Sequence, residues 1–266
     1  MKKLVRIAAA CALALSAQTA WATPSTVFWS PATTYVQPFL VPHITYDMYF
    51  NDRAAYPMDL GLTMGVLPFE KLQAEVGIDL FLPYWNTFFV QPAGALQLNA
   101  KAGLVEGAYG EWFPGITAGI YGVGVNQGTQ FDVLHGEVGK TFSFGALTVG
   151  GFYGAGGANG IWSDVDGVVL TRGGFMASYV SPDVVLDLKG LYKINFCADV
   201  MTGNSAFSAA GGGVGIYFTP AIDIITGPVF FLNKYAQPGL STMMWSVQLD
   251  VDIDFGAKPP PEPSKS

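Results

Sequence analysis

The chain has 266 residues, of which 50% are hydrophobic, 14% are aromatic and only 12% are charged. Its 20 acidic residues outnumber its 13 lysines and arginines, which argues against a nucleic-acid partner because such affinity comes from neutralising phosphates. With 33 glycines and a positive mean hydropathy, the composition is also unusual for a soluble enzyme.

The N-terminus predicts a cleaved secretory signal over residues 1–22. Lys2, Lys3 and Arg6 form a positive region, and an apolar stretch follows over 7–17. The small-x-small run Ala20-Trp21-Ala22 is a cleavage site, so we expect the mature chain to begin at Thr23. The signal carries three of the 13 basic residues and none of the acids, which leaves 10 basic and 20 acidic residues.

Residues 23–42 do not follow a strand pattern. Four prolines interrupt the segment, and proline is disfavoured in a central strand because it cannot donate to the ladder. The aromatic residues Phe28, Trp29, Tyr35 and Phe39 lie between them. An irregular strand is one reading of this segment, but we favour a periplasmic arm or a plug of a barrel lumen.

From residue 43 onward, apolar and polar residues alternate with a period of two. Between 245 and 255 the odd positions are apolar and the even positions are mostly acidic or polar, which is typical of a barrel strand with one apolar and one polar face. The same alternation recurs along the chain. It predicts twelve strands at about 43–51, 59–69, 71–83, 95–106, 115–126, 131–143, 146–156, 166–180, 184–194, 205–218, 222–234 and 242–255.

Two long uncharged stretches, 141–163 and 200–222, invite a different reading as membrane-spanning helices. Both are rich in glycine, which costs about 1 kcal/mol per position in a helix interior relative to alanine. We therefore assign them to strands, although glycine leaves the facing of the strands at 115–126, 146–156 and 205–218 open.

The predicted connections alternate between short and long. Short turns are expected at 69–70, 112–114, 143–146, 181–183 and 219–221. Longer connections are expected at 52–58, 84–94, 127–130, 157–165, 195–204 and 235–241. Short periplasmic turns, longer outer loops and an even strand count are typical of a closed transmembrane β-barrel. Aromatic residues flank the short turns as a girdle would: Phe69, Trp112, Phe113, Phe142, Phe144, Tyr179, Tyr217, Phe218 and Phe255.

On these features the chain resembles the Gram-negative outer-membrane β-barrels over nearly all of Pro42–Phe255. The resemblance implies an outer-membrane location, contact with outer-membrane lipid and lipopolysaccharide, and recognition by the barrel-assembly machinery. The final strand ends in Phe255, which looks like the assembly signal of that class. One departure is the tail 256–266, whose prolines predict an extended, unpacked periplasmic segment.

Strand parity predicts which charged side chains line the lumen. Lys101 can neutralise Glu75 or Asp79 on the neighbouring strand, and Lys189 and Lys193 lie beside Asp187. The set admits two interpretations, a weakly cation-preferring pore lined by carboxylates or an interior closed by hydrogen bonds. The expected lumen-lining residues are Asp47, Glu75, Asp79, Lys101, Asp187, Lys189, Lys193, Asp250, Asp252 and Asp254.

The last strand carries the sharpest feature, a ladder of Asp250, Asp252 and Asp254. If this strand closes the barrel, it meets the first strand, where His43 and Asp47 share the same face. The ladder can hold a cation or bind the N-terminal segment, but a solvated lumen wall is the simpler interpretation, and we assign no metal site.

The sequence gives little indication of a catalytic site. Some outer-membrane barrels of this strand number are hydrolases, but only His43 and His135 are available in this chain, and neither has a nucleophile at suitable spacing. We predict no enzymatic activity and no cofactor. Cys197 is the only cysteine after the signal, so an intramolecular disulfide is excluded, and we place it in an outer loop.

Two functions remain open. The first is a passive, weakly cation-preferring channel for small solutes. The second is a closed structural or interaction barrel that works through its outer loops, its N-terminal arm or its tail. The sequence identifies neither the solute nor the oligomeric state.

Overall fold

The computed structural model describes residues 25–51, 57–82, 96–125, 129–157, 161–164, 166–237 and 240–255. The predicted signal over 1–22 and the tail over 256–266 lie outside this part of the chain. The described residues form thirteen strands and a short 3-10 helix, Lys234–Ala236. Within them, no helix combines the length and the hydropathy needed to span a bilayer.

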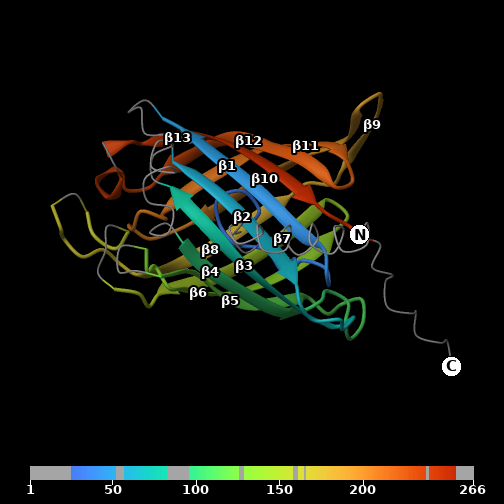
Figure 1. The fold of residues 1–266 in the computed structure, drawn as a ribbon, viewed down its shortest axis with the longest axis horizontal. Coiled ribbons are helices and arrows are strands. Elements are labelled where there is room, and N and C mark those ends of the chain that lie inside the picture. Colours follow the sequence, from blue (N-terminus) through green and yellow to red (C-terminus); the bar gives the residue numbers. More distant parts are fainter. Residues whose placement is uncertain are drawn as a thin grey trace, which may run out of the picture.

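Most of the strands pair with their neighbours along the chain (Figure 1). They are β1 (Pro42–Phe50), β2 (Met58–Gly65), β3 (Leu72–Leu82), β4 (Leu96–Leu104), β5 (Gly115–Gly124), β6 (Val133–Phe142), β7 (Gly145–Gly154), β8 (Gly173–Val180), β9 (Val184–Leu188), β10 (Leu191–Met201), β11 (Ala209–Thr219), β12 (Ile222–Phe231) and β13 (Met243–Asp252).

The sheet closes on itself because β13 pairs antiparallel with β1, with His43 opposite Asp252 and Phe50 opposite Trp245. The pairing of β10 with β11 completes the ring. The strands β8 and β9 lie one after the other along β10, so the wall is a closed antiparallel barrel of twelve strands plus one extra strand. Closure confirms the predicted architecture and leaves the wall itself without an open edge.

The region around β9 departs from the prediction. Ser181-Pro182-Asp183 was expected to reverse the chain, but β8 and β9 both run antiparallel to β10, so the chain continues in one direction through it. Proline interrupts the ladder because it lacks an N–H, and at this point Phe196 N of β10 donates to the Ser181 hydroxyl at 2.9 Å. The reversal occurs instead at residues 189–190.

This change moves the following elements by several residues. The expected outer loop 195–204 was wrong, because β10 extends to Met201 and the loop is 202–208. Cys197 is therefore not a loop residue but a buried residue of β10. Figure 1 shows the β9–β10 hairpin projecting beyond the other strands.

Other connections also differ from the regular alternation of the prediction. Residues 105–114 form a hydrogen-bonded connection at the end where we expected only a short turn over 112–114. Glu106 fastens this connection to β6, since its carboxylate lies 2.8 Å from Lys140 Nζ and accepts the Thr141 hydroxyl at 2.8 Å. The predicted strand 166–180 begins only at Gly173, and β13 ends at Asp252, so Phe255 lies exposed beyond the last strand.

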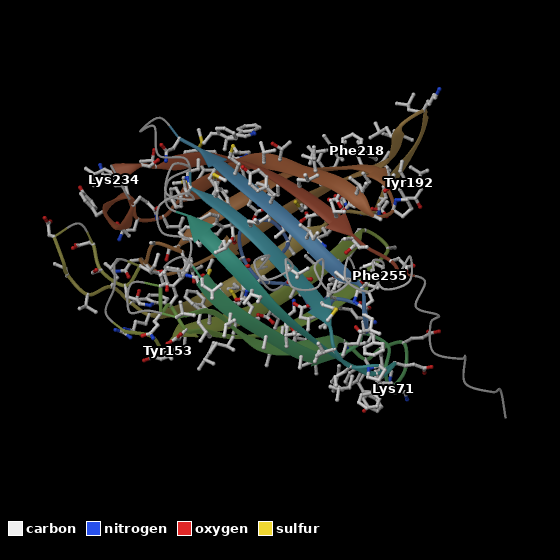
Figure 2. All side chains as sticks on the ribbon, in the orientation of Figure 1. Lys71, Tyr153, Tyr192, Phe218, Lys234 and Phe255 are labelled. Atoms are coloured by element: carbon white, nitrogen blue, oxygen red, sulfur yellow. The ribbon has the colours of Figure 1, made fainter. Side chains whose placement is uncertain are left out.

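The two ends of the barrel are distinct (Figure 2). Lys71, Tyr192, Phe218 and Phe255 gather at one end, which we call the short-turn end, and Tyr153 and Lys234 at the other, the long-loop end. Of the predicted aromatic girdle at the short-turn end, most members are exposed, but Tyr217 lies on the lumen side with Lys193 over its ring.

The outside of the wall is apolar. Every second residue of the strands points outward, and large aliphatic and aromatic side chains at these positions remain exposed: Val76, Leu98, Ile116, Leu134, Val138, Leu147, Val149, Phe175, Phe196, Phe230, Trp245 and Leu249. The opposite faces bury mainly polar and charged residues. An apolar outside on a closed barrel is what a bilayer requires, so the fold is a transmembrane β-barrel.

The chain before β1 lies inside this wall. Residues 25–38, the N-terminal segment, form hydrogen bonds with side chains on β3, β10 and β13, three strands that are well separated around the wall. The segment leaves the lumen through a tight turn in which Val41 N donates to Pro38 O at 3.1 Å and Leu40 adopts a φ of 58°. Phe39 forms a bridge with Gly65 just before β1 begins.

Candidate functional site: the occupied lumen

A single carboxylate on β10 holds the middle of the N-terminal segment. One oxygen of Asp199 accepts the backbone N–H groups of Phe28, Trp29 and Ser30 at 3.1, 2.8 and 2.8 Å, and the Ser30 hydroxyl at 3.2 Å. Successive N–H groups around one anion form a nest, which stabilises the charge. Gln248 of β13 donates to Phe28 O at 2.6 Å, so the segment is gripped from two strands.

A second carboxylate, Glu75 of β3, bonds both ends of the segment. It accepts from the backbone N and the hydroxyl of Ser25, both at 2.9 Å, and from the backbone N of Gln37. Lys101 of β4 lies 3.5 Å from Glu75 and donates to Ser25 O at 3.0 Å. Both charged side chains are almost fully buried, and the segment completes their hydrogen bonding.

Further contacts spread around the wall. The Trp29 indole donates to Phe207 O at 2.8 Å, and Gln37 Nε2 donates to Asp252 at 2.8 Å. The Ser178 hydroxyl of β8 donates to Ala32 O. Because these partners come from β8, β13 and a long-loop connection, the segment crosses the lumen rather than following one side of it.

Glycines of the wall make room for the segment. A Cβ at Gly211 would lie 2.7 Å from the Phe28 ring, and one at Gly213 would lie 3.0 Å from it. A Cβ at Gly65 would collide with the backbone oxygens of Gln37 and Pro38. The glycine-rich strand β11, whose facing the sequence left open, thus turns glycines toward the lumen where Phe28 packs.

Several of the predicted lumen-lining charges do lie on the inner face of the barrel. Asp47, Glu75, Asp79 and Lys101 are buried on the inner face, and Glu75 meets Lys101 in register. His43 lies between Asp250 at 3.2 Å and Asp252 at 3.0 Å, across the β1–β13 closure.

The remaining predicted charges lie near or beyond the short-turn end. Lys193 is on the inner face and pairs with Asp183 at 2.7 Å, and the side chain of Asp187 lies outside the described part of the chain. Lys189 is exposed in the 189–190 turn and does not line the lumen, and Asp254 is exposed beyond β13.

The sequence prediction did not include four acidic residues that lie on the inner face. Asp59, Glu137, Asp199 and Asp223 share the inner face with the predicted set, by their register with Asp47, Thr117, Ser178 and Asp250. The alternation that identified the other lumen residues could have found Asp59, Glu137 and Asp223. Asp199 could not be found in this way, because the sequence assigned it to a loop.

Around β1–β4 the inner face is rich in carboxylates and amides. Asp47 accepts from the Thr45 hydroxyl at 3.0 Å and the Tyr49 hydroxyl at 3.2 Å, and Asn99 donates to Asp79. Asp59 lies opposite Asp47 in register. Among the described residues, no group of His, Cys, Asp or Glu side chains has the arrangement of a metal site.

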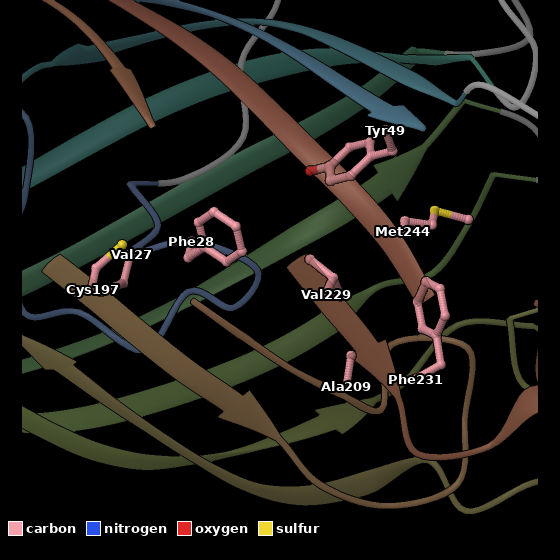
Figure 3. Packing of buried hydrophobic residues seen from close by; sticks show 8 residues of the cluster. All are labelled: Val27, Phe28, Tyr49, Cys197, Ala209, Val229, Phe231 and Met244. Carbon is pink, nitrogen blue, oxygen red and sulfur yellow. The ribbon is translucent and has the colours of Figure 1, made fainter. Parts of the chain in front are cut away.

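Apolar side chains fill the lumen at the long-loop end. Phe28, Tyr49, Phe231 and Met244 belong to one buried group with Val27, Cys197, Ala209 and Val229 (Figure 3). A second buried group includes Tyr121, Phe131, Phe152 and Trp162, with Phe207 packed against it. The long-loop end of the lumen therefore combines these apolar groups with the buried carboxyl groups of Asp47, Asp59 and Asp79 on β1–β3, which the sequence alone did not predict.

Comparison with known proteins finds only distant similarity. No family model and no curated protein matches the chain. Among solved structures, it is similar to an outer-membrane channel from Pseudomonas putida F1, with 11% identity over 84% of this chain and 99% of that chain and a TM-score of 0.44. A Rhodopseudomonas blastica porin variant gives 10% identity, 74% and 55% coverage and a TM-score of 0.34. Salmonella typhi OmpF in complex with daunomycin gives 8% identity, 80% and 96% coverage and a TM-score of 0.36.

Proposed function

We propose that the protein is an outer-membrane channel for small solutes whose lumen is closed by its own N-terminal segment. The observation that carries this proposal is the kind of contact that holds the segment. Its main anchors are hydrogen bonds from its backbone to two wall carboxylates, Glu75 and Asp199, and it joins the wall covalently only at β1. Such a segment can leave the lumen without breaking any strand pairing of the barrel.

The inner face of the wall leaves space for the N-terminal segment. A barrel of about eight strands is filled by its own side chains, and larger barrels open. In this twelve-stranded wall, Gly65, Gly211 and Gly213 contribute no side chain where the segment packs. Withdrawal of the segment would leave space in the lumen. Small solutes could then diffuse through it passively, without a chemical step.

We also propose that the opened lumen prefers cations weakly. Most of the charged side chains on the inner face are acidic, and rings of carboxylates attract cations. Among the described residues, the lysines on this face include Lys101 and Lys193, and the acids include Asp47, Asp59, Glu75, Asp79, Glu137, Asp199, Asp223, Asp250 and Asp252.

An outer-membrane location follows the same reasoning. The apolar outside of a closed β-barrel needs lipid around it, and cleaved secretory signals direct such barrels across the inner membrane. We propose outer-membrane lipid and lipopolysaccharide as its surroundings and the barrel-assembly machinery as its insertion partner, with Phe255 as part of the assembly signal.

The decisive experiment is planar-bilayer conductance of the refolded mature protein and of a variant lacking residues 23–38. We expect small or intermittent currents from the mature protein and steady, larger currents from the variant. Altered mobility of unheated samples on a gel serves as the control for correct folding of both proteins. A folded deletion variant that never conducts would contradict the channel proposal.

That result would favour the second candidate, a closed interaction barrel. The observation that supports this candidate is the projecting β9–β10 hairpin, where Val185 is 73% exposed and Leu188 is 60% exposed. Exposed apolar residues on a strand edge are typical of association sites.

Selectivity is tested with the deletion variant under a salt gradient. Asp250→Asn together with Asp252→Asn should shift the reversal potential toward zero, since both carboxylates line the lumen beside His43. Asp254→Asn is the matched control, because Asp254 lies beyond β13 and is exposed. If the double variant and Asp254→Asn shifted the reversal potential equally, Asp250 and Asp252 would not explain a cation preference.

A further inference from the structure

The long-loop end of the lumen contains a connected group of rings, which we call the aromatic cluster: Tyr121, Phe131, Phe152, Trp162 and Phe207. Phe207 is at its centre, with ring centroids 5.6 Å from Phe131, 5.8 Å from Tyr121 and 5.8 Å from Trp162. All three contacts are edge-to-face, which is a favoured geometry for aromatic pairs.

The cluster joins the outer loops to the lumen. Trp162 comes from the connection between β7 and β8, and Phe207 comes from the connection between β10 and β11. The Trp162 ring covers Gly154, where any side chain would collide with it. Trp29 of the N-terminal segment reaches the same place, because its indole donates to Phe207 O. A solute that enters from the long-loop end therefore meets these aromatic rings.

Two buried polar atoms border these rings without a hydrogen-bond partner. Trp162 is 1% exposed, and its indole Nε1 makes no hydrogen bond. His135 is 6% exposed and packs edge-on to Tyr121 at 5.7 Å; its Nδ1 bonds to Glu137, but its Nε2 has no partner. Buried polar atoms are almost always paired with protein or with water, so these two atoms can form a hydrogen bond with a molecule that enters the lumen.

We infer that the aromatic cluster is a binding site for small ring-containing solutes that carry a hydrogen-bond acceptor. This inference rests on the proposed channel function and names its solute class. The solute ring replaces or adds to the edge-to-face contacts of Phe207, and its hydroxyl or carbonyl oxygen accepts the indole N–H of Trp162. A hydroxyl can in addition use the free Nε2 of His135.

The charge of the lumen refines the solute class. Asp47, Asp59 and Asp79 are buried on the neighbouring strands β1–β3. The aromatic cluster approaches them through Phe81, whose ring centroid lies 6.5 Å from that of Phe131. An anionic group would lose its hydration in this buried site and would find acidic rather than basic side chains at Asp47, Asp59 and Asp79, so neutral ring compounds should bind and ring carboxylates should be rejected.

The test is solution NMR of the folded mature protein in lipid nanodiscs with ¹⁵N-labelled tryptophan. Trp162→Phe assigns the indole resonance of Trp162. Benzyl alcohol should shift that resonance saturably, whereas benzoate and glucose should leave it unchanged at equal concentration. The Trp245 indole, which bonds to Thr226 on the outside of the wall, is the internal control for partition into lipid.

Affinity measurements complete the test. Trp162→Phe keeps a ring but removes the N–H, so it should weaken benzyl alcohol binding about fivefold, as expected for one net hydrogen bond of about 1 kcal/mol. Trp245→Phe should leave the affinity unchanged. Binding in this comparison is followed by competition with a fluorinated benzyl alcohol in ¹⁹F spectra, which needs no tryptophan signal.

The outcomes separate this inference from the proposed function. Suppose that the segment-deletion variant conducts, but that benzyl alcohol shifts the Trp162 and Trp245 indole resonances equally or shifts neither of them. The proposed solute class is then wrong, and the proposed channel function is retained. If benzyl alcohol binds at Trp162 and the deletion variant never conducts, the site stands as a ligand site of a closed barrel. Saturable binding that is equally strong in Trp162→Phe would also overturn the inference.

Discussion

Replacing Asp199 by alanine should release the N-terminal segment. The carboxylate oxygen of Asp199 accepts three consecutive backbone N–H groups and one hydroxyl, and the nearest wall contact on the same stretch is the single bond from Gln248 to Phe28 O. Alanine leaves these donors buried and unpaired, because the site is enclosed by β10 and the segment itself.

The magnitude follows from the number of bonds. Each buried donor that loses its partner costs about 1–3 kcal/mol, and water that enters the enlarged site recovers part of this. A net loss of about 3 kcal/mol corresponds to about a hundredfold increase in the population with the segment displaced. Asp199→Asn keeps one acceptor oxygen and should give an intermediate increase.

Cys197 provides the assay. It is the only cysteine after the predicted signal, it is 7% exposed, and it belongs to the same buried group as Val27 and Phe28; Figure 3 shows it beside Val27. A water-soluble maleimide can reach the thiol only after the segment moves. The labelling rate should therefore rise about a hundredfold in Asp199→Ala, in proportion to the displaced population.

Two controls accompany the labelling assay. The variant lacking residues 23–38 should label fastest, and the gel mobility of unheated samples must show that every variant is folded. An unchanged labelling rate in folded Asp199→Ala, with fast labelling of the deletion variant, would show that the Asp199 nest does not hold the segment in place.

Three further predictions concern other contacts. Lys101→Met removes the cationic partner of the buried Glu75 carboxylate and should lower the free energy of unfolding in urea by about 3 kcal/mol, and adding Glu75→Gln should recover part of that loss. Gly65→Ala should speed Cys197 labelling, because its Cβ collides with the backbone of the segment, whereas Gly136→Ala should not, since its nearest neighbouring atom is 3.6 Å away. Burial raises the pKa of Glu106, but hydrogen bonds from Lys140 and Thr141 outweigh it and hold that pKa below its ordinary value. The ionised Glu106 therefore stabilises the fold above the ordinary carboxyl pKa, by under about 1 kcal/mol for such a surface pair, and this contribution is lost as the pH falls through the lowered pKa. Glu106→Gln should thus lower the free energy of unfolding at neutral pH and leave it unchanged in acid.

Much of the wall could be predicted because its signal is local. In a strand, successive side chains point to opposite faces, so the alternation around 72–82 and 245–251 already separates an apolar outside from a polar inside. The same parity made Glu75 or Asp79 the expected partner of Lys101 and brought His43 to the acidic last strand. In the structure, Lys101 lies 3.5 Å from Glu75, and His43 lies 3.2 Å from Asp250 and 3.0 Å from Asp252.

The errors arose where the local signal was ambiguous. Ser181-Pro182-Asp183 has the composition of a turn, yet the pairing of β8 and β9 with the same strand outweighs it. This single misreading displaced Cys197 and Asp199 into a loop and thereby concealed the carboxylate that holds the N-terminal segment.

By itself, the sequence determined a closed transmembrane barrel of twelve strands, because strand periodicity depends only on neighbours along the chain. Only the tertiary structure decided what fills the barrel. The contacts of Phe28 with Gly211 and Gly213, and of Asp199 with residues 28–30, join positions far apart in the chain, and no periodic pattern encodes them. The aromatic cluster is of the same kind, since Trp162 and Phe207 come from separate loops and meet only because the closed wall turns both into one lumen.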